Sequence, residues 1–227
     1  MNSLSADVIA AFAIGLIGSS HCLVMCGGIA GALQLAMPPQ RPGYRLQLQI
    51  LLSLGRLSTY ALFGALVGYF GASAMQLAGT SLIWLRLFAG LLLLMMALYI
   101  SRLWFGLVHL ERLGQALWRK VQPVARRLLP LNSSAKAYAY GLCWGTLPCG
   151  LVYSTLGWSL ASGSASAGAL LMLAFGLGTA PAILLTGSAA NALVKLKNRM
   201  LFRYTAAALL AIYAGFTIWL AIRRLVF

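Results

Sequence analysis

Two cysteines, Cys22 and Cys149, lie beside residues that weaken or interrupt a helix. Cys22 belongs to the segment GSSHCLVMCGG, in which two glycines follow Cys26, and Cys149 belongs to GLCWGTLPCG, in which Pro148 precedes it. Glycine costs a helix about 1 kcal/mol relative to alanine, and proline removes a backbone donor. We therefore expect each of the two cysteines to lie next to a helix break.

A cysteine at a helix break can do chemistry that a sealed cysteine cannot. Thiol–disulfide exchange needs a thiolate that attacks a disulfide sulfur, and a thiol buried among apolar side chains is unreactive. At a break, such as the one that Gly145 and Gly150 flank, a thiol can meet water, backbone N–H groups and a visiting protein. Two such cysteines on different helices can form one disulfide if their Cα atoms come within about 7 Å. That disulfide would store two electrons.

The first segment also contains soft metal ligands. His21, Cys22, Met25 and Cys26 lie within a few residues of one another, and thiolates and thioethers favour Cu(I). His21 could instead polarise Cys22 or be an interior histidine with satisfied hydrogen bonds. A Cu(I) site is therefore an alternative to a disulfide, which would need no cofactor.

An arginine, a further cysteine and two methionines can also be interpreted from their types and positions. Arg56 lies near the start of an apolar segment, where an arginine is a functional candidate or extends its charged end to the membrane interface. Cys143 is interpreted as a small packing residue, because a single membrane cysteine usually behaves as a small hydrophobe. Met95 and Met96 are interpreted as packing or lipid-facing residues.

The composition places this chemistry inside a membrane. Of 227 residues, 61% are hydrophobic and only 8% are charged, compared with about 25% charged residues in soluble domains. The 17 lysines and arginines lie between apolar segments, where anionic lipid explains them better than nucleic acid. Asp7 and Glu111 are the only acidic residues, which argues against a carboxylate-based pump or a hard-cation site.

Six apolar segments are long enough to cross a bilayer, and lipid admits such segments only as helices. The sequence therefore predicts an all-α polytopic membrane protein. The expected spans are Leu4–Met25, Leu48–Leu66 with a possible extension to Phe70, Leu82–Leu103, Ala137–Leu160, Ala167–Ala189 and Phe202–Ile222.

Lysine and arginine concentrate in the loops after the first, third and fifth spans. The positive-inside rule makes these loops cytoplasmic, so that both termini lie on the extracytoplasmic side. Arg223 and Arg224 at the C-terminus do not follow this pattern, but they are outnumbered.

The two halves of the chain resemble each other. Cys22 precedes Cys149 by 127 positions, and Gly55 and Gly64 precede Gly178 and Gly187 by 123. With three spans in each half, the second half must be inverted relative to the first, and inverted repeats share a site near the midplane. The expected organisation is a first three-helix repeat at 1–108, a cytoplasmic amphipathic linker at 109–135 and a second repeat at 136–227. In the linker, we expect Pro123 to break or kink a helix that lies on the lipid surface.

In the segments around its cysteines and glycines, the sequence resembles the CcdA/DsbD superfamily of membrane thiol–disulfide electron carriers. It is most similar to the UreH-like or sulfite-exporter (TauE/SafE)-like branch. The segments that carry the resemblance are HCLVMCGG at His21–Gly28, LGRLSTY at Leu54–Tyr60, LPCGLVY at Leu147–Tyr153 and FGLGTAPAILLTG at Phe175–Gly187.

The resemblance implies six helices in two inverted repeats in a bacterial inner membrane. It also implies that Cys22 and Cys149 accept electrons from cytoplasmic thioredoxin and pass them to an extracytoplasmic thiol or metallochaperone protein. Pro148 would be the family's proline before the second cysteine, whereas His21 replaces the corresponding proline of CcdA-type members in the first half. Members of the UreH-like branch are associated with cytochrome oxidase maturation and copper handling, so Met25 and Cys26 keep the Cu(I) transporter or copper-delivery alternative open.

Overall fold

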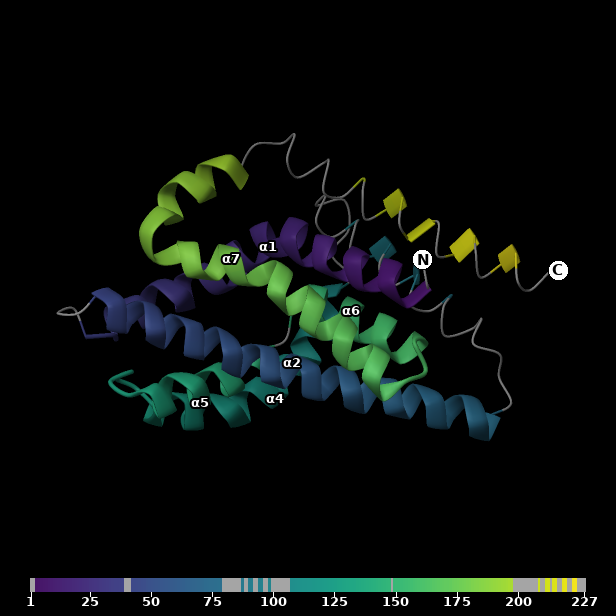
Figure 1. Ribbon diagram of the computed structural model, residues 1–227, viewed down its shortest axis with the longest axis horizontal. Helices are drawn as coiled ribbons and strands as arrows, with labels where there is room; N and C mark the ends of the chain where they lie inside the picture. The colour runs from purple at the N-terminus through teal and green to yellow at the C-terminus, as the bar shows by residue number, and fades with distance from the viewer. Residues whose placement is uncertain are drawn as a thin grey trace.

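Helices make up every element in the described part of the computed structural model, in agreement with the all-α prediction (Figure 1). The structure describes residues 3–38, 42–78, 107–147 and 149–197, with 87, 90–91, 94–95, 98, 208, 211–212, 214–215, 218–219 and 222–223. The expected third span at 82–103 and sixth span at 202–222 lie largely outside the described residues. The described helices are α1 (Ser3–Leu35), α2 (Pro42–Ala78), α4 (Leu107–Arg127), α5 (Ser134–Gly145), α6 (Gly150–Ala161) and α7 (Ala165–Lys197).

The expected fourth span is divided into two helices, as the glycines and proline in it predict. Helix α5 ends at Gly145, and the next turn is closed by Thr146, whose backbone N–H and Oγ1 both donate to the carbonyl of Cys143, at 3.1 and 2.7 Å. Helix α6 begins at Gly150. Pro148 lies outside the described residues, but the break between Gly145 and Gly150 is confirmed.

The break expected in the first span is wrong, because α1 continues through Gly27 and Gly28 to Leu35. Each glycine costs a helix only about 1 kcal/mol. The following turns bury Ala30 and Leu33 in the protein core, at 5% and 3% exposure. Burying these apolar side chains outweighs the weak local preference, since a fully buried leucine alone contributes about 1.5–3 kcal/mol.

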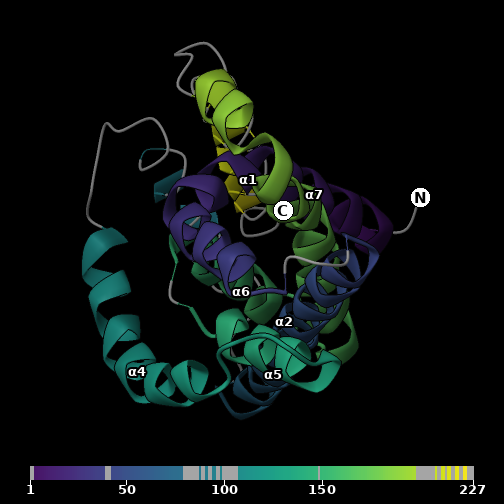
Figure 2. The same cartoon turned by 90° about the vertical axis from the view of Figure 1, so that its left-hand side faces the viewer.

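Helices α2 and α7 cross in the centre of the molecule, and the other helices pack around them (Figures 1 and 2). Helix α1 packs along α7, and α5 packs along α2. Helix α6 contacts both α2 and α7, while α4 lies at the periphery against α5 and α6. The break before α6 is thereby surrounded by long helices.

Glycines allow two of these helix pairs to approach with backbone against backbone. A Cβ atom on Gly55 of α2 would collide with the carbonyl oxygen of Tyr138 on α5 and lie 3.0 Å from Gly141 Cα. A Cβ atom on Gly15 of α1 would likewise collide with the carbonyl oxygen of Phe175 on α7 and lie 3.2 Å from Gly178 Cα. Small residues at such crossings are typical of helix packing in membranes, where close approach provides the attraction.

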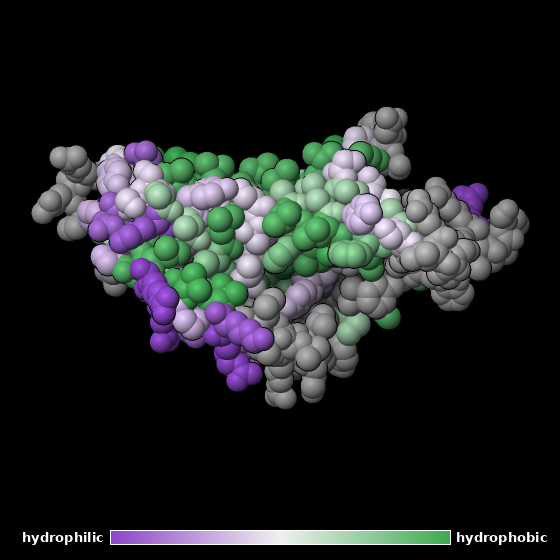
Figure 3. Space-filling view, turned by 90° about the horizontal axis from the view of Figure 1, so that it is seen from below, coloured by the Kyte–Doolittle hydropathy of each residue, from purple (hydrophilic) through white to green (hydrophobic). Residues whose placement is uncertain are grey.

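The outer face of α2 is apolar from Leu46 to Leu66. Leu46, Ile50, Leu54, Leu62 and Leu66 are all more than 40% exposed and recur at intervals of four or eight residues. Residues four apart lie on one face of a helix, and soluble monomers rarely expose so large an apolar patch. Figure 3 shows hydrophobic residues across the middle of one side of the molecule and hydrophilic ones gathered at one end.

Among the described residues, two helices are long and apolar enough to cross a membrane, at Gly43–Ser73 and Ala165–Leu184. A shorter apolar helix covers Leu4–Ser19. These segments coincide with the first, second and fifth expected spans.

Helix α4 continues through Pro123 without the break that this proline could cause, and Figure 2 shows it curving around the molecule. Arg119, Lys120, Arg126 and Arg127 are exposed on it. A helix with such a strong basic face fits the surface position expected for residues 109–135.

Candidate functional site

Cys149 occupies the residue immediately before α6. Its backbone is extended, with φ −140° and ψ 148°, and it caps the helix that begins at Gly150. The positive end of the helix dipole and its first N–H groups favour negative charge at this position. The half-buried Cys149 also packs against a core cluster that contains Leu151 and Phe175. The expected helix break therefore places this residue at the N-terminus of α6, where its side chain makes no capping hydrogen bond.

Cys22 and Cys26 lie on one face of the continuous helix α1, one turn apart. Cys22 is buried and Cys26 is partly buried. One turn before Cys22, a Cβ atom on Gly18 would meet the side chain of Leu151 at 2.9 Å. Gly18 thus brings α1 against the first turn of α6, which is the helix that Cys149 caps.

Arg56 on α2 is buried between the helices that carry the cysteines. Its side chain is 3% exposed, and its Nη2 donates a 2.6 Å hydrogen bond to Thr179 Oγ1 on α7. Its Cζ lies 5.4 Å from the ring centroid of Tyr60 and 5.9 Å from that of Trp144 on α5, within the range of cation–π interactions. This arginine is therefore enclosed by protein and does not extend its charged end to the surface of the molecule.

The two cysteine segments meet at the first core cluster. Cys149 packs against this cluster, which contains Tyr60 and Leu151. Gly18, one turn before Cys22, approaches the Leu151 side chain of the same cluster. No disulfide joins any two of the four cysteines as the structure describes them. The candidate site therefore contains thiols from α1 and α6, a phenol and a guanidinium.

Tyr60, Trp144 and Thr179 belong to the site although no spacing rule selected them as candidates. Tyr60 follows Arg56 by four residues, which places both on one face of α2. Thr179 lies 123 positions after Arg56, which is the same offset that relates Gly55 to Gly178. The spacing of Tyr60 and the offset of Thr179 can both be read from the sequence. Only the packing of α2 against α7 shows that they place these residues beside Arg56.

Two supporting glycines and Cys143 contribute to packing. A Cβ atom on Gly145 would lie 2.6 Å from the Thr59 side chain, so this glycine lets α5 approach α2 as well as ending α5. Gly150 is buried at the first turn of α6. Cys143 packs at the edge of a second core cluster that contains Leu52 and Trp144, as expected for a packing cysteine.

A small pocket lies beside the second cluster. Its walls include Gln34 and Met37 of α1, Gln49 of α2, Trp144 of α5 and Ile183 of α7. Cys26 packs against the same buried cluster that supplies most of these walls. The pocket thus extends from the segment that joins α1 and α2 to the indole that covers Arg56.

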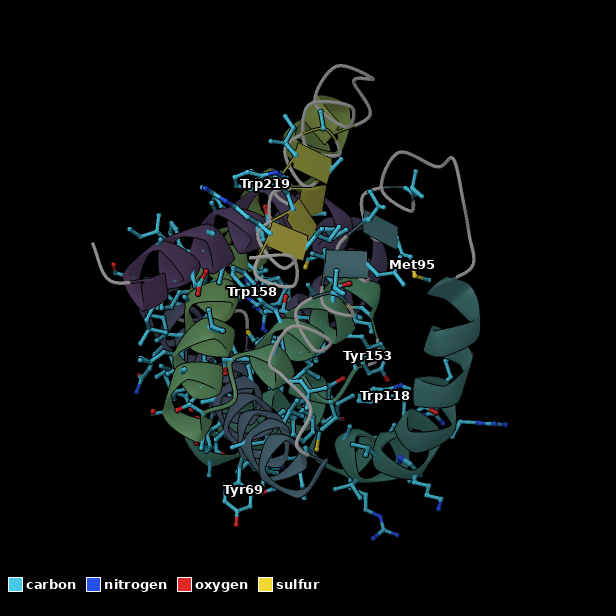
Figure 4. All side chains as sticks on the ribbon, turned by 90° about the vertical axis from the view of Figure 1, so that its right-hand side faces the viewer. Tyr69, Met95, Trp118, Tyr153, Trp158 and Trp219 are labelled. Atoms are coloured by element: carbon cyan, nitrogen blue, oxygen red, sulfur yellow. The ribbon has the colours of Figure 1, made fainter. Side chains whose placement is uncertain are left out.

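Of the four candidate Cu(I) ligands, Cys22 and Cys26 have described side chains. The side chains of His21 and Met25 lie outside the described residues. The described side chains contain no group of three or more His, Cys, Asp and Glu residues placed to hold a metal ion. Met95 packs against the first core cluster, which also contains Trp158 of α6, and Figure 4 shows these two residues apart from each other. Met96 lies outside the described residues.

Comparison with known proteins relates this architecture to one family. No curated protein and no solved structure matches the chain. A family model described as the transmembrane region of cytochrome c biogenesis proteins matches residues 10–217, which include every residue of the candidate site. The match confirms the resemblance to the CcdA/DsbD superfamily and shows a membrane protein. The chain belongs to the family of cytochrome c biogenesis transmembrane regions.

Proposed function

We propose that this protein carries reducing equivalents across the membrane through a reversible Cys22–Cys149 disulfide. One observation carries the proposal: Gly18, one turn before Cys22 on α1, packs against Leu151 in the first turn of α6, the helix that Cys149 immediately precedes. The family match over residues 10–217 supports it, because the family serves cytochrome c biogenesis. The position of Cys149 at the start of α6 supplies the helix terminus that favours a thiolate.

The exchange conserves electrons and protons at each step. A thiolate of a cytoplasmic thioredoxin-like dithiol attacks one sulfur of the Cys22–Cys149 disulfide, and the other cysteine leaves as a thiolate. The second thiol of the partner then attacks the mixed disulfide, so that the partner leaves oxidised. The pair has gained two electrons, and two protons complete its thiols. The reduced pair then passes the two electrons to a disulfide of an extracytoplasmic thiol protein or metallochaperone in the same way.

The distribution of charge supports a bacterial inner-membrane location with both termini outside. Arg119, Lys120, Arg126 and Arg127, which are exposed on α4, and the half-buried Arg45 near the start of α2 belong to the loops and loop ends assigned to the cytoplasm. The pocket beside Gln34 and Gln49 lies toward this end of α1 and α2. It is the natural approach for the cytoplasmic partner.

The glycine contacts support two inverted three-helix repeats. The approach of Gly15 on α1 to Gly178 on α7 matches the approach of Gly141 on α5 to Gly55 on α2. Gly15 corresponds to Gly141, and Gly55 to Gly178, at sequence offsets of 126 and 123 that are close to those of the repeat. An exchange of the two halves would interchange these contacts, and inverted repeats permit a shared site to face each side in turn.

The segment at His21–Gly28 supports a place in the UreH-like branch, with a role in cytochrome oxidase maturation.

The test of the proposal is alkylation of the protein in membranes under oxidising and reducing conditions, followed by mass mapping of the cysteines. We expect Cys22 and Cys149 to be protected together as one disulfide after oxidation. A different pairing, or four cysteines that alkylate equally in both conditions, contradicts the proposal.

Replacing Cys26 distinguishes electron transfer from the Cu(I) alternative. We expect Cys26→Ser to retain electron transfer to within about twofold, because the exchange needs only one pair of sulfur atoms. The measurement is the rate at which reduced thioredoxin is oxidised by proteoliposomes that contain the variant and an enclosed disulfide acceptor. The opposite outcome has two parts: the reduced protein binds Cu(I) stoichiometrically, and Cys26→Ser abolishes both this binding and electron transfer. That outcome would favour the metal function instead.

A further inference from the structure

Arg56 is a buried cation, and the few carboxylates of the chain lie away from it. The sequence contains only Asp7 and Glu111 as acidic residues. Asp7 lies eight residues, about 12 Å along the helix axis, before Gly15 of α1, which contacts the residue before Thr179 on α7. Glu111 belongs to α4, which packs against α5 and α6 at the periphery. A buried charge without a counter-charge is strongly unfavourable.

The contacts that hold the guanidinium leave its charge unbalanced. Arg56 Nη2 donates to Thr179 Oγ1 at 2.6 Å, and this hydroxyl donates its own hydrogen to the carbonyl oxygen of Gly176 at 2.8 Å. The ring centroids of Tyr60 and Trp144 lie 5.4 and 5.9 Å from the Cζ atom. A neutral hydroxyl and two aromatic rings orient a cation, but they carry no net negative charge. An anion would therefore be stabilised here.

Two buried polar groups on one face of α2 are left without a partner. Among the described residues, neither Arg56 Nε nor Ser53 Oγ has a hydrogen-bond partner, although both side chains are more than nine-tenths buried. Ser53 precedes Arg56 by three residues, which places both on the same face of the helix. Ser58 and Thr59 of the same helix instead donate to the carbonyl oxygens four residues before them. Buried polar groups are normally satisfied, so these two indicate a ligand that accepts hydrogen bonds.

The small pocket described above reaches the surroundings of this cation. Trp144 forms part of the pocket wall and also contacts Arg56. On α2 the wall residue Leu52 lies one turn before Arg56, and on α7 the wall residue Ile183 lies one turn after Thr179. The Trp144 Nε1 group is buried and, in the part of the chain that the structure describes, has only a weak acceptor, a thiol of α1. The pocket therefore leads to a third incompletely used donor.

We propose that Arg56, Ser53 and Trp144 bind a small monovalent inorganic anion, such as a halide, that enters through this pocket. One guanidinium balances one negative charge, whereas a divalent ion would leave a second charge buried without a partner. The three side chains supply N–H and O–H donors, which suit an ion that only accepts hydrogen bonds. The site is independent of the proposed disulfide, because no thiol has to ionise or react when the anion binds.

Binding of radioactive chloride to the full-length reduced protein in detergent tests the inference, in a gluconate buffer of constant ionic strength. We expect saturable binding of about one chloride per chain, because one cation is unbalanced. Unlabelled bromide should compete with it, and sulfate should compete at least about tenfold less well, because its second charge stays unpaired. Chloride should also raise the temperature of unfolding relative to gluconate, because a ligand of the folded state stabilises it.

Arg56→Gln should weaken chloride binding by about tenfold or more, because it removes a charge-assisted hydrogen bond, and Ser53→Ala by about threefold or more. Two variants are matched controls. Arg126→Gln removes an exposed charge from α4, and Ser58→Ala removes an α2 hydroxyl that already donates to the carbonyl oxygen of Leu54 at 3.0 Å. Both controls should bind chloride to within about twofold of the parent protein.

Chloride binding that does not saturate overturns the inference, and so does binding that Arg56→Gln leaves within about twofold of the parent. An equal loss in Arg126→Gln would show attraction by net charge instead of a site, and equal competition by sulfate contradicts a monovalent ligand. If Arg56→Gln does not fold, Ser53→Ala decides, since unchanged binding in that variant also contradicts the site. Chloride binding and disulfide formation are measured separately, so this inference and the proposed function can fail separately.

Discussion

Replacing Cys22 or Cys149 by serine should reduce the capture of thioredoxin to background, a loss of at least about a hundredfold. The capturing protein is a thioredoxin without its second cysteine, so that attack on the membrane protein stops at the mixed disulfide. Each serine variant leaves a single cysteine of the pair and therefore no disulfide that the thioredoxin thiolate can attack. The measurement is the amount of mixed disulfide on a non-reducing gel after oxidation of the membranes.

Cys143→Ser is the matched control, because Cys143 lies on α5 just before the break that precedes Cys149 and packs in the core. We expect it to capture thioredoxin to within about twofold of the parent protein. Full capture by both Cys22→Ser and Cys149→Ser would show that the pair is not the carrier. Equal amounts of each variant in the membrane, measured by immunoblot, exclude loss of the protein as the explanation.

Gly55→Ala should destabilise the protein by about 3 kcal/mol or more, the upper range for an overpacked core. The new methyl group would collide with the carbonyl oxygen of Tyr138 and lie 2.9 Å from Leu142 N, both of which are backbone atoms of α5. Backbone cannot move aside as a flexible side chain can, so α2 and α5 would have to separate. The measurement is unfolding of the purified protein in detergent, followed by tryptophan fluorescence.

Gly31→Ala provides the control for this substitution. Gly31 lies within α1, and a Cβ atom there would meet nothing within 4 Å. We expect Gly31→Ala to be neutral or to stabilise the protein by up to about 1 kcal/mol, because alanine favours a helix over glycine. Gly178→Ala, which corresponds to Gly55 in the proposed repeat, should be as damaging as Gly55→Ala. A tolerated Gly55→Ala would contradict the close approach of α2 and α5.

Composition and local pattern were enough to predict the membrane class, the helical architecture and the break between Gly145 and Gly150. Lipid admits few alternatives to a helix, and the glycines and proline at Gly145–Gly150 together lower the helix preference of that segment. The same local reasoning failed at Gly27 and Gly28, where α1 continues because the next turns are buried. Local preferences of about 1 kcal/mol decide the structure only where packing does not oppose them.

The environment of Arg56 depended on contacts between helices that no local pattern specifies. Its partner Thr179 and its neighbour Trp144 are 123 and 88 positions away in the chain, on α7 and α5. An arginine near the end of an apolar segment can reach the interface or remain inside, and the sequence permits both. Close packing of α2 against α5 and α7 encloses this one and brings Trp144 and Thr179 to its guanidinium. Burial of this charge is thus a property of the assembled bundle.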